Sequence, residues 1–134
     1  ALPILNGIDM PLVNLFLQKR WEDKDGNIYA KRIGTLVIRM DKNTDWVNDA
    51  SFTILYGDIT KRSDYKEYMG FQLGESARYS LNSKGKNVPI QEIGWGTEDD
   101  EVTHMILEFC SSHGGSYIGS PGNTFWVDNI RLGY

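Results

Sequence analysis

The sequence predicts an all-β domain built as a β-sandwich, and three observations support this fold class. Short apolar runs rich in β-branched and aromatic residues recur along the chain, separated by turn residues at spacings of about 8–12 residues. The turns depend on glycine, of which the chain contains 14 against 4 prolines. Neither a strand–helix alternation nor an internal repeat is present, so we expect a single domain over residues 1–134.

The first half of the chain predicts several strands and one tight turn. Residues 12–21 fit a helix as well as a strand, and the β character of the rest of the chain favours the strand. Asp25-Gly26 lies between apolar residues and indicates a hairpin turn in which both positions take a positive φ. Residues 33–40 form a β-branched run long enough to be buried on both faces, and residues 51–56 alternate as a half-buried strand does.

The second half of the chain also predicts strands rather than helices. The segments with strand character are residues 68–73, 88–95, 102–109 and 124–132. In the third of these segments, alternation places three apolar side chains on the core side, namely Met105, Leu107 and Phe109.

The last segment allows two arrangements of its side chains. In the first, a β-bulge near Asp128 and Asn129 turns apolar residues of both parities toward the core, namely Phe125, Val127, Ile130 and Leu132. In the second, no bulge is needed, and the inward residues are Trp126, Ile130 and Leu132. We interpret Trp126 mainly as a core residue.

Charge and composition argue against several classes of protein. The net charge of −4 and the absence of any Lys/Arg run longer than two argue against nucleic acid as a partner. No segment approaches the roughly 20 apolar residues of a transmembrane helix. The single cysteine, Cys110, excludes an internal disulfide. Because the chain opens Ala-Leu-Pro-Ile-Leu without a methionine, we expect it to be excised from a longer protein, whose missing part could have carried a signal or a lipid anchor.

The C-terminal stretch, residues 109–134, resembles the end of the putative carbohydrate metabolism domain of Bacteroidetes surface lipoproteins. That family closes with a strand, a Ser-Ser loop, spaced glycines and a final strand around an apolar-Val-Asp core. The matching positions are Ser111, Ser112, Gly115, Gly119, Gly122, Trp126, Val127, Asp128, Ile130, Leu132 and Tyr134. Ser116 and Asn123 depart from the family pattern.

The resemblance implies both an architecture and a setting. The fold would be a jelly-roll-like antiparallel β-sandwich, similar to galactose-binding-like and carbohydrate-binding modules. The protein would belong to a glycan-utilisation system at a bacterial cell surface or in the periplasm, and its partner would be a polysaccharide or oligosaccharide.

Four aromatic residues are the candidate glycan contacts, because flat rings stack on the apolar face of a pyranose. Trp95 stands between two glycines just before the acidic run 98–101; the alternative is that Trp95 ends a core strand and the run is a solvated turn. Trp46 follows a polar loop and is either a stacking platform or a lid on the core. Tyr65 and Tyr68 flank a charged turn, where simple surface packing is the alternative.

Metal ligation has little support in the sequence. Runs that begin at Asp23 and Asp41 have acidic or amide side chains at every second position, but they lack the later glycine and glutamate of an EF-hand loop. By resemblance to related jelly rolls, Asp128 is the candidate ligand for a structural calcium ion. We expect no other cofactor.

Three functions therefore compete at the level of sequence. The first is a non-catalytic, carbohydrate-associated binding domain, and the second is a glycoside hydrolase-like domain that uses carboxylates of the run 98–101. The third is a structural module that docks on a neighbouring domain. Ser111, Ser112 and His113 do not make a convincing nucleophile and base, because adjacent loop residues rarely reach one another correctly.

Overall fold

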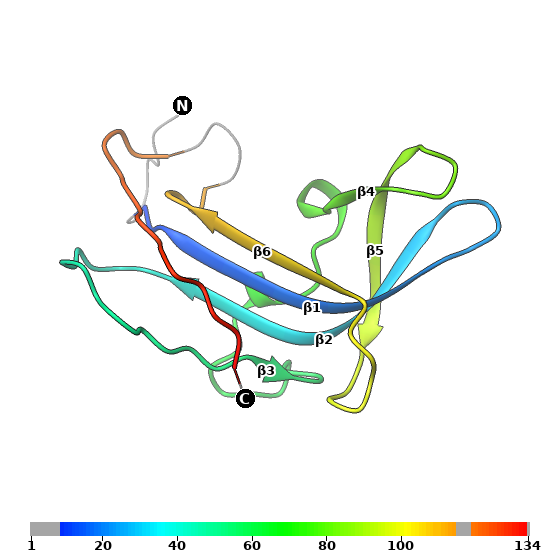
Figure 1. Ribbon diagram of the computed structural model, residues 1–134, viewed down its shortest axis with the longest axis horizontal. Coiled ribbons are helices and arrows are strands. Elements are labelled where there is room, and N and C mark those ends of the chain that lie inside the picture. Colours follow the sequence, from blue (N-terminus) through cyan, green and yellow to red (C-terminus); the bar gives the residue numbers. More distant parts are fainter. Residues whose placement is uncertain (1–8, 115–118, 134) are drawn as a thin grey trace. The chain divides into compact units, whose positions relative to one another are not determined.

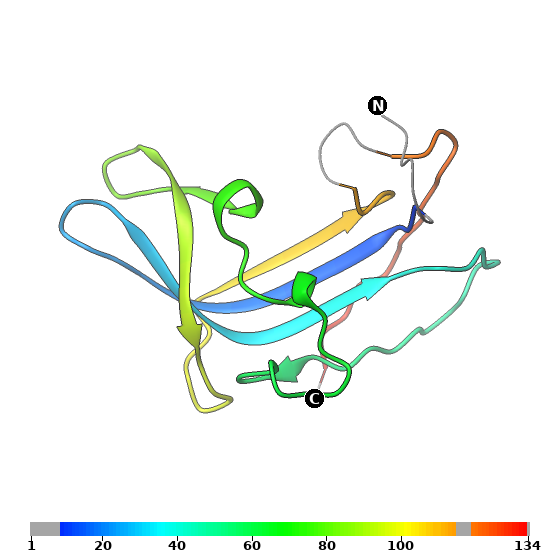
Figure 2. The same cartoon turned by 180° about the vertical axis from the view of Figure 1, so that it is seen from behind.

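The protein is all-β, as the sequence predicts. The structure is a computed structural model that describes residues 9–114 and 119–133 (Figure 1). Its strands are β1 (Leu12–Glu22), β2 (Ile28–Arg39), β3 (Leu55–Tyr56), β4 (Tyr79–Leu81), β5 (Asn87–Trp95) and β6 (His104–Cys110). Two short 3₁₀ helices, η1 (Glu67–Met69) and η2 (Gly74–Ser76), lie in the coil between β3 and β4, which Figure 2 shows in green from behind.

The six strands form one mixed sheet in the order β4-β5-β2-β1-β6, and β3 also pairs with β2. β2 and β5 run parallel, which differs from the wholly antiparallel sheet that the sequence predicts. A parallel pair needs a long crossover, and the long connection from β2 to β5 provides one. Because the described strands make a single sheet, the two-sheet packing of a jelly roll stays a prediction.

The chain divides into two compact units. Of the described residues, the first unit comprises 9–13, 38–50, 108–114 and 119–133, and the second comprises 14–37 and 51–107. Among the residues that the structure describes, no helix has the length and apolar character needed to cross a lipid bilayer.

The core of the second unit lies along β1 and β2. Leu15, Leu17 and Ile33 form one buried cluster, and Ile28, Ala30 and Ile90 form another. The residues of β1 are buried without interruption up to Gln18, so that both faces of this strand are covered. The sequence predicts such two-sided burial for residues 33–40, but in β2 the burial weakens after Thr35.

Local patterning locates the long strands correctly. β1, β5 and β6 match the strands predicted at 12–21, 88–95 and 102–109, and β2 includes nearly all of 33–40. Met105, however, is 45% exposed and does not face a core, whereas Leu107 and Phe109 are partly buried.

Three predicted strands are wrong or mostly wrong. Residues 51–56 contribute only the two residues of β3, residues 68–73 begin in η1, and residues 124–132 contain no strand. In the last segment Trp126 is 78% exposed rather than part of the core, while Phe125 packs on Phe109 with ring centroids 6.0 Å apart. Apolar residues alone do not make a strand, because a strand also needs a neighbour for its backbone hydrogen bonds.

Two hairpin turns in the second unit share one design. Each turn begins with an Asx residue, Asp23 or Asn82, and has a glycine three residues later, Gly26 or Gly85. The glycines take φ values of 85° and 76°, respectively. In the first turn only the glycine has a positive φ, which corrects the expectation that Asp25 also has one. A left-handed glycine after a type I turn matches the twist of the adjoining strands.

The tips of these two hairpins are hydrogen-bonded to each other. The Asn82 amide donates to the Gly26 carbonyl at 2.9 Å, and the Glu22 carboxylate accepts a hydrogen bond from the Ser83 hydroxyl at 2.6 Å. Within its own turn, Asn82 Oδ1 accepts from the backbone N–H groups of Lys84 and Lys86 at 3.0 and 2.9 Å. One buried side chain therefore closes its own turn and holds the neighbouring one.

Candidate functional site

A buried ion pair links the parallel strands β2 and β5. Arg32 donates from Nε and Nη2 to the two carboxylate oxygens of Glu92, both at 2.5 Å. The side chains are 0% and 1% exposed, respectively. A two-pronged geometry of this kind is the strongest form that an Arg–carboxylate pair takes.

Further hydrogen bonds surround the pair. Gln18 donates to Glu92 Oε2 at 3.1 Å, and the Gln72 backbone N–H donates to Glu92 Oε1 at 2.9 Å. Arg32 also donates to the Gly70 carbonyl at 3.0 Å, while its guanidinium carbon lies 3.8 Å from the centroid of the Phe16 ring. The pair ties the coil at 70–72 to the sheet, and the hydrogen bonds compensate for the loss of water around both charges.

Trp95 and Tyr65 both lie near this cluster. Trp95 ends β5, where its half-buried ring is 4.7 Å from the Phe71 ring centroid and 5.9 Å from the Arg32 guanidinium carbon. The Tyr65 hydroxyl packs on Gly70, where a Cβ atom would come within 2.8 Å of it. These contacts favour the interpretation that Trp95 ends a core strand.

The other predicted contacts lie elsewhere. Tyr68 is exposed on η1 in the second unit, whereas Trp46 belongs to the first unit. Trp95 and Tyr65 therefore lie near the same buried ion pair in the second unit, whereas Trp46 belongs to the first unit.

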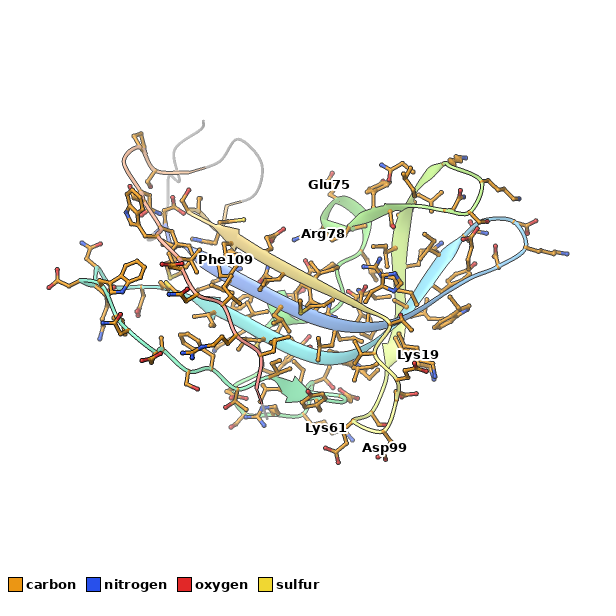
Figure 3. The ribbon with its side chains drawn as sticks, in the orientation of Figure 1. Lys19, Lys61, Glu75, Arg78, Asp99 and Phe109 are labelled. Atoms are coloured by element: carbon orange, nitrogen blue, oxygen red, sulfur yellow. The ribbon has the colours of Figure 1, made fainter. Side chains whose placement is uncertain are left out.

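The acidic run 98–101 forms a turn after β5. Asp100 Oδ2 accepts a hydrogen bond from the Thr97 backbone N–H at 2.9 Å, and Lys19 lies 3.5 Å from Oδ1. The hydrogen bond from Thr97 lowers the pKa of Asp100, and Lys19 adds to this effect. Asp99 points outward at the tip of the turn (Figure 3). This arrangement matches the turn interpretation of the run rather than a pair of catalytic carboxylates.

A groove of about 480 Å³ opens beside β5 in the second unit. The coil that carries Glu75 and Arg78 borders it (Figure 3). Its lining residues are mostly apolar, namely Leu73, Gly74, Ala77, Tyr79, Pro89, Ile90, Gln91, Glu92 and Ile93. The volume lies within the range of about 300–1,000 Å³ typical of ligand sites.

Sequence reasoning missed this groove. The alternation of β5 could have identified Ile93 as an exposed apolar residue, since Ile90 and Glu92 are buried and Ile93 is not. Nothing local, however, predicts that the coil at 73–77 lies beside β5.

Trp46 is exposed in a polar loop of the first unit. Its side chain is 59% exposed, and the indole Nε1–H donates to Asn48 Oδ1 at 2.9 Å. Nearby in the chain, Asp49 accepts a hydrogen bond from Arg131 at 2.7 Å. The hydrogen bond to Asn48 orients the indole, and the exposure of Trp46 favours a platform over a lid on the core.

A second cluster of the first unit surrounds Asp9. Its carboxylate accepts hydrogen bonds from the Ser112 hydroxyl and the Ser120 backbone N–H, both at 2.7 Å. His113 Nδ1 accepts the Met10 backbone N–H at 2.9 Å, so this nitrogen carries no proton. Because Ser112 donates to Asp9 and not to an imidazole, the cluster anchors a loop and does not form a nucleophile–base pair.

Acidification below about pH 4 is expected to weaken the Asp9 cluster. Burial alone would raise the pKa of Asp9, but hydrogen bonds from Ser112, Ser120 and His113 outweigh it and lower the pKa below 3.8. Because the pKa is lowered in the folded state, the stabilisation is present above the ordinary pKa and is lost as the pH falls. Thermal melts should therefore show Asp9→Asn less stable than the wild type near neutral pH, with the gap narrowing in acid. A gap that does not vary with pH would contradict this assignment.

Asp128, the candidate calcium ligand, is exposed and accepts a hydrogen bond from the Asn129 backbone N–H at 2.8 Å. Within residues 9–114 and 119–133, no three His, Cys, Asp or Glu side chains come together as a metal site would require. The matching positions Gly115 and Tyr134, and the departing position Ser116, lie outside the described residues.

Comparisons of the chain with protein-family models, with curated proteins and with solved structures find no match.

Proposed function

We propose that this protein is a non-catalytic, carbohydrate-associated binding domain of a bacterial glycan-utilisation protein, located at the cell surface or in the periplasm. The observation that carries the proposal is the exposed indole of Trp46, oriented by Asn48 within a polar loop. The resemblance of residues 109–134 to a domain of Bacteroidetes surface lipoproteins supports the same function.

The Trp46 loop combines the two features that sugar recognition uses. An exposed indole offers a flat apolar face for a pyranose ring. The loop also carries Asp41, Asn43 and Asp45, whose exposed side chains can accept hydrogen bonds from hydroxyl groups. Since the Nε1–H is already bonded to Asn48, stacking rather than hydrogen bonding is the interaction left to the indole.

Trp46→Ala is expected to weaken glycan binding at least tenfold, about 1.4 kcal/mol, because the stacking platform is lost. A glycan array identifies the polysaccharide class, and isothermal titration then compares the variants. Val47→Ala is the matched control, since Val47 is the adjacent residue and is also exposed. Repeating the titration with calcium and with a chelator tests the role proposed for Asp128.

Two results would count against this function. If the folded wild type bound no glycan on the array, carbohydrate would be excluded as the ligand. Equal weakening by Trp46→Ala and Val47→Ala would show that the loop as a whole, rather than the indole, is required.

Catalysis on glycans gains no support from the groove. Glu92, the carboxylate in its lining, is bonded to Arg32, Gln18 and Gln72. A general acid must reach the glycosidic oxygen, and both carboxylate oxygens of Glu92 are already engaged by hydrogen-bond donors of the protein.

A structural module that docks on another domain is the second candidate. Trp126, Ile130 and Leu132 are all more than half exposed in the C-terminal part of the first unit. Large apolar side chains gathered in one exposed segment are typical of interaction surfaces. An absence of binding on the glycan array would favour this role as a structural module.

A further inference from the structure

The edge of β5 that faces away from β2 is only partly paired. β4 pairs with β5 from Leu81↔Asn87 to Tyr79↔Pro89, and the Ile90 N–H then donates to the Arg78 carbonyl at 2.7 Å. Beyond this point the preceding chain turns away through η2. Among the strands that the structure describes, none pairs with residues 91–95 on this side, while β2 occupies the opposite side.

The groove runs along this open edge. Its lining includes five consecutive residues of β5, from Pro89 to Ile93. Side chains alternate between the faces of a strand, so a cavity on one face would contact only every second residue. Contact with consecutive residues therefore places the groove at the backbone edge, where N–H and C=O groups point outward.

The walls of the groove suit a chain with apolar side chains. Ile93 is 58% exposed, and the lining also includes the exposed apolar side chains of Leu73 and Tyr79. The wall is also held in place, because the Gln72 N–H donates to Glu92 and Glu92 is locked to Arg32. A preformed site of this kind loses little conformational entropy when a ligand binds.

We propose that this groove binds an extended polypeptide segment of a partner protein, which adds as a strand to the free edge of β5. The incoming strand continues the line of β4 and places apolar side chains at alternate positions against Ile93, Leu73 and Tyr79. Backbone pairing supplies affinity, and the apolar walls select the sequence, as in other cases of strand addition. Five residues of β5 offer about 17 Å of edge at about 3.3 Å per residue.

Selection from a displayed library of random heptapeptides tests the proposal with the whole chain as bait. The wild type should enrich peptides that have apolar residues at alternate positions. Ile93→Lys should bind an enriched peptide at least tenfold more weakly, because a charge then lies in the apolar groove. Leu81→Lys is the matched control: Leu81 is 68% exposed in the same unit but lies outside the groove lining, and its variant should bind normally.

The backbone contribution is tested with the enriched peptide itself. Methylation of every second amide nitrogen, on the edge that pairs, should abolish binding, while methylation of the other set should leave it intact. In the complex, the backbone amides of residues 91–95 that point toward the open edge, unlike those that point toward β2, should exchange at least tenfold more slowly. Circular dichroism is used to check that each variant keeps the fold. We expect that it does, because the side chains of Ile93 and Leu81 are both exposed.

Three outcomes would overturn the proposal. The first is failure of the folded wild type to enrich any alternating peptide. The second is a dimer in sedimentation that Ile93→Lys disrupts, which would make a second copy of the chain the occupant. The third is glycan binding that is lost in Ile93→Lys and kept in Trp46→Ala.

Discussion

Arg32→Met is expected to lower the free energy of unfolding by about 3–5 kcal/mol. The variant leaves the Glu92 carboxylate buried without the guanidinium that now bonds both of its oxygens. It also removes the donor to the Gly70 carbonyl, so the coil at 70–72 loses one of its links to the sheet. Urea denaturation followed by tryptophan fluorescence measures the change, and Trp95, close to the guanidinium, reports on the site itself.

The exposed pair Arg62–Asp64 is the control for this result. Arg62 Nε lies 2.8 Å from Asp64 Oδ1, but both side chains are about half exposed. Arg62→Met should leave stability almost unchanged, because water solvates each charge without the other. If Arg32→Met and Arg62→Met lowered the free energy of unfolding equally, burial of the Arg32–Glu92 pair could not explain the loss.

The double variant Arg32→Met/Glu92→Leu should recover much of the lost stability. Replacing both members of a buried pair removes the stranded charge, whereas replacing one leaves it. A double-mutant cycle then isolates the coupling between the two side chains. Purely additive losses would contradict the view that they act as a unit.

Asn82→Ala is expected to cost about 2 kcal/mol, the second largest effect. The substitution removes the donor to the Gly26 carbonyl and the acceptor for the Lys84 and Lys86 N–H groups. Since Asn82 is buried, these backbone groups are not easily reached by replacement water.

Amide exchange distinguishes this effect from a general loss of stability. The Lys84 and Lys86 amides should exchange faster in Asn82→Ala under native conditions, because their acceptor is gone. Asn87→Ala, at an exposed position of β5, should change stability by less than about 0.5 kcal/mol. Unchanged exchange at Lys84 and Lys86 would show that Asn82 does not hold the turn.

Trp95 and Trp46 show that neighbours in the sequence do not always predict how exposed an indole is. Glycines on both sides of Trp95 suggest an uncrowded indole, but Gly96 is buried, and Trp95 packs on Phe71. The glycine is needed because a Cβ atom at position 96 would come within 2.9 Å of Ile33. Trp46, in contrast, is exposed, as the polar residues before it in the sequence suggest. The exposure of a side chain in a surface loop depends less on packing against segments far away in the chain.

The all-β class, the positions of β1, β2, β5 and β6, and the glycine turn at Gly26 could all be predicted from the amino-acid sequence. These features follow from side-chain alternation and turn stereochemistry, which act over a few residues.

The pairing of the strands, in contrast, became visible only in the folded chain. The parallel pairing of β2 with β5 brings Arg32 to Glu92, 60 positions along the chain, and beyond Ile90 no described strand pairs with the other edge of β5. The folded chain also leaves residues 124–132 without a strand, although their apolar pattern predicts one. Pairing depends on hydrogen bonds and packing between segments far apart in the chain, and no local pattern encodes which of several apolar segments will meet.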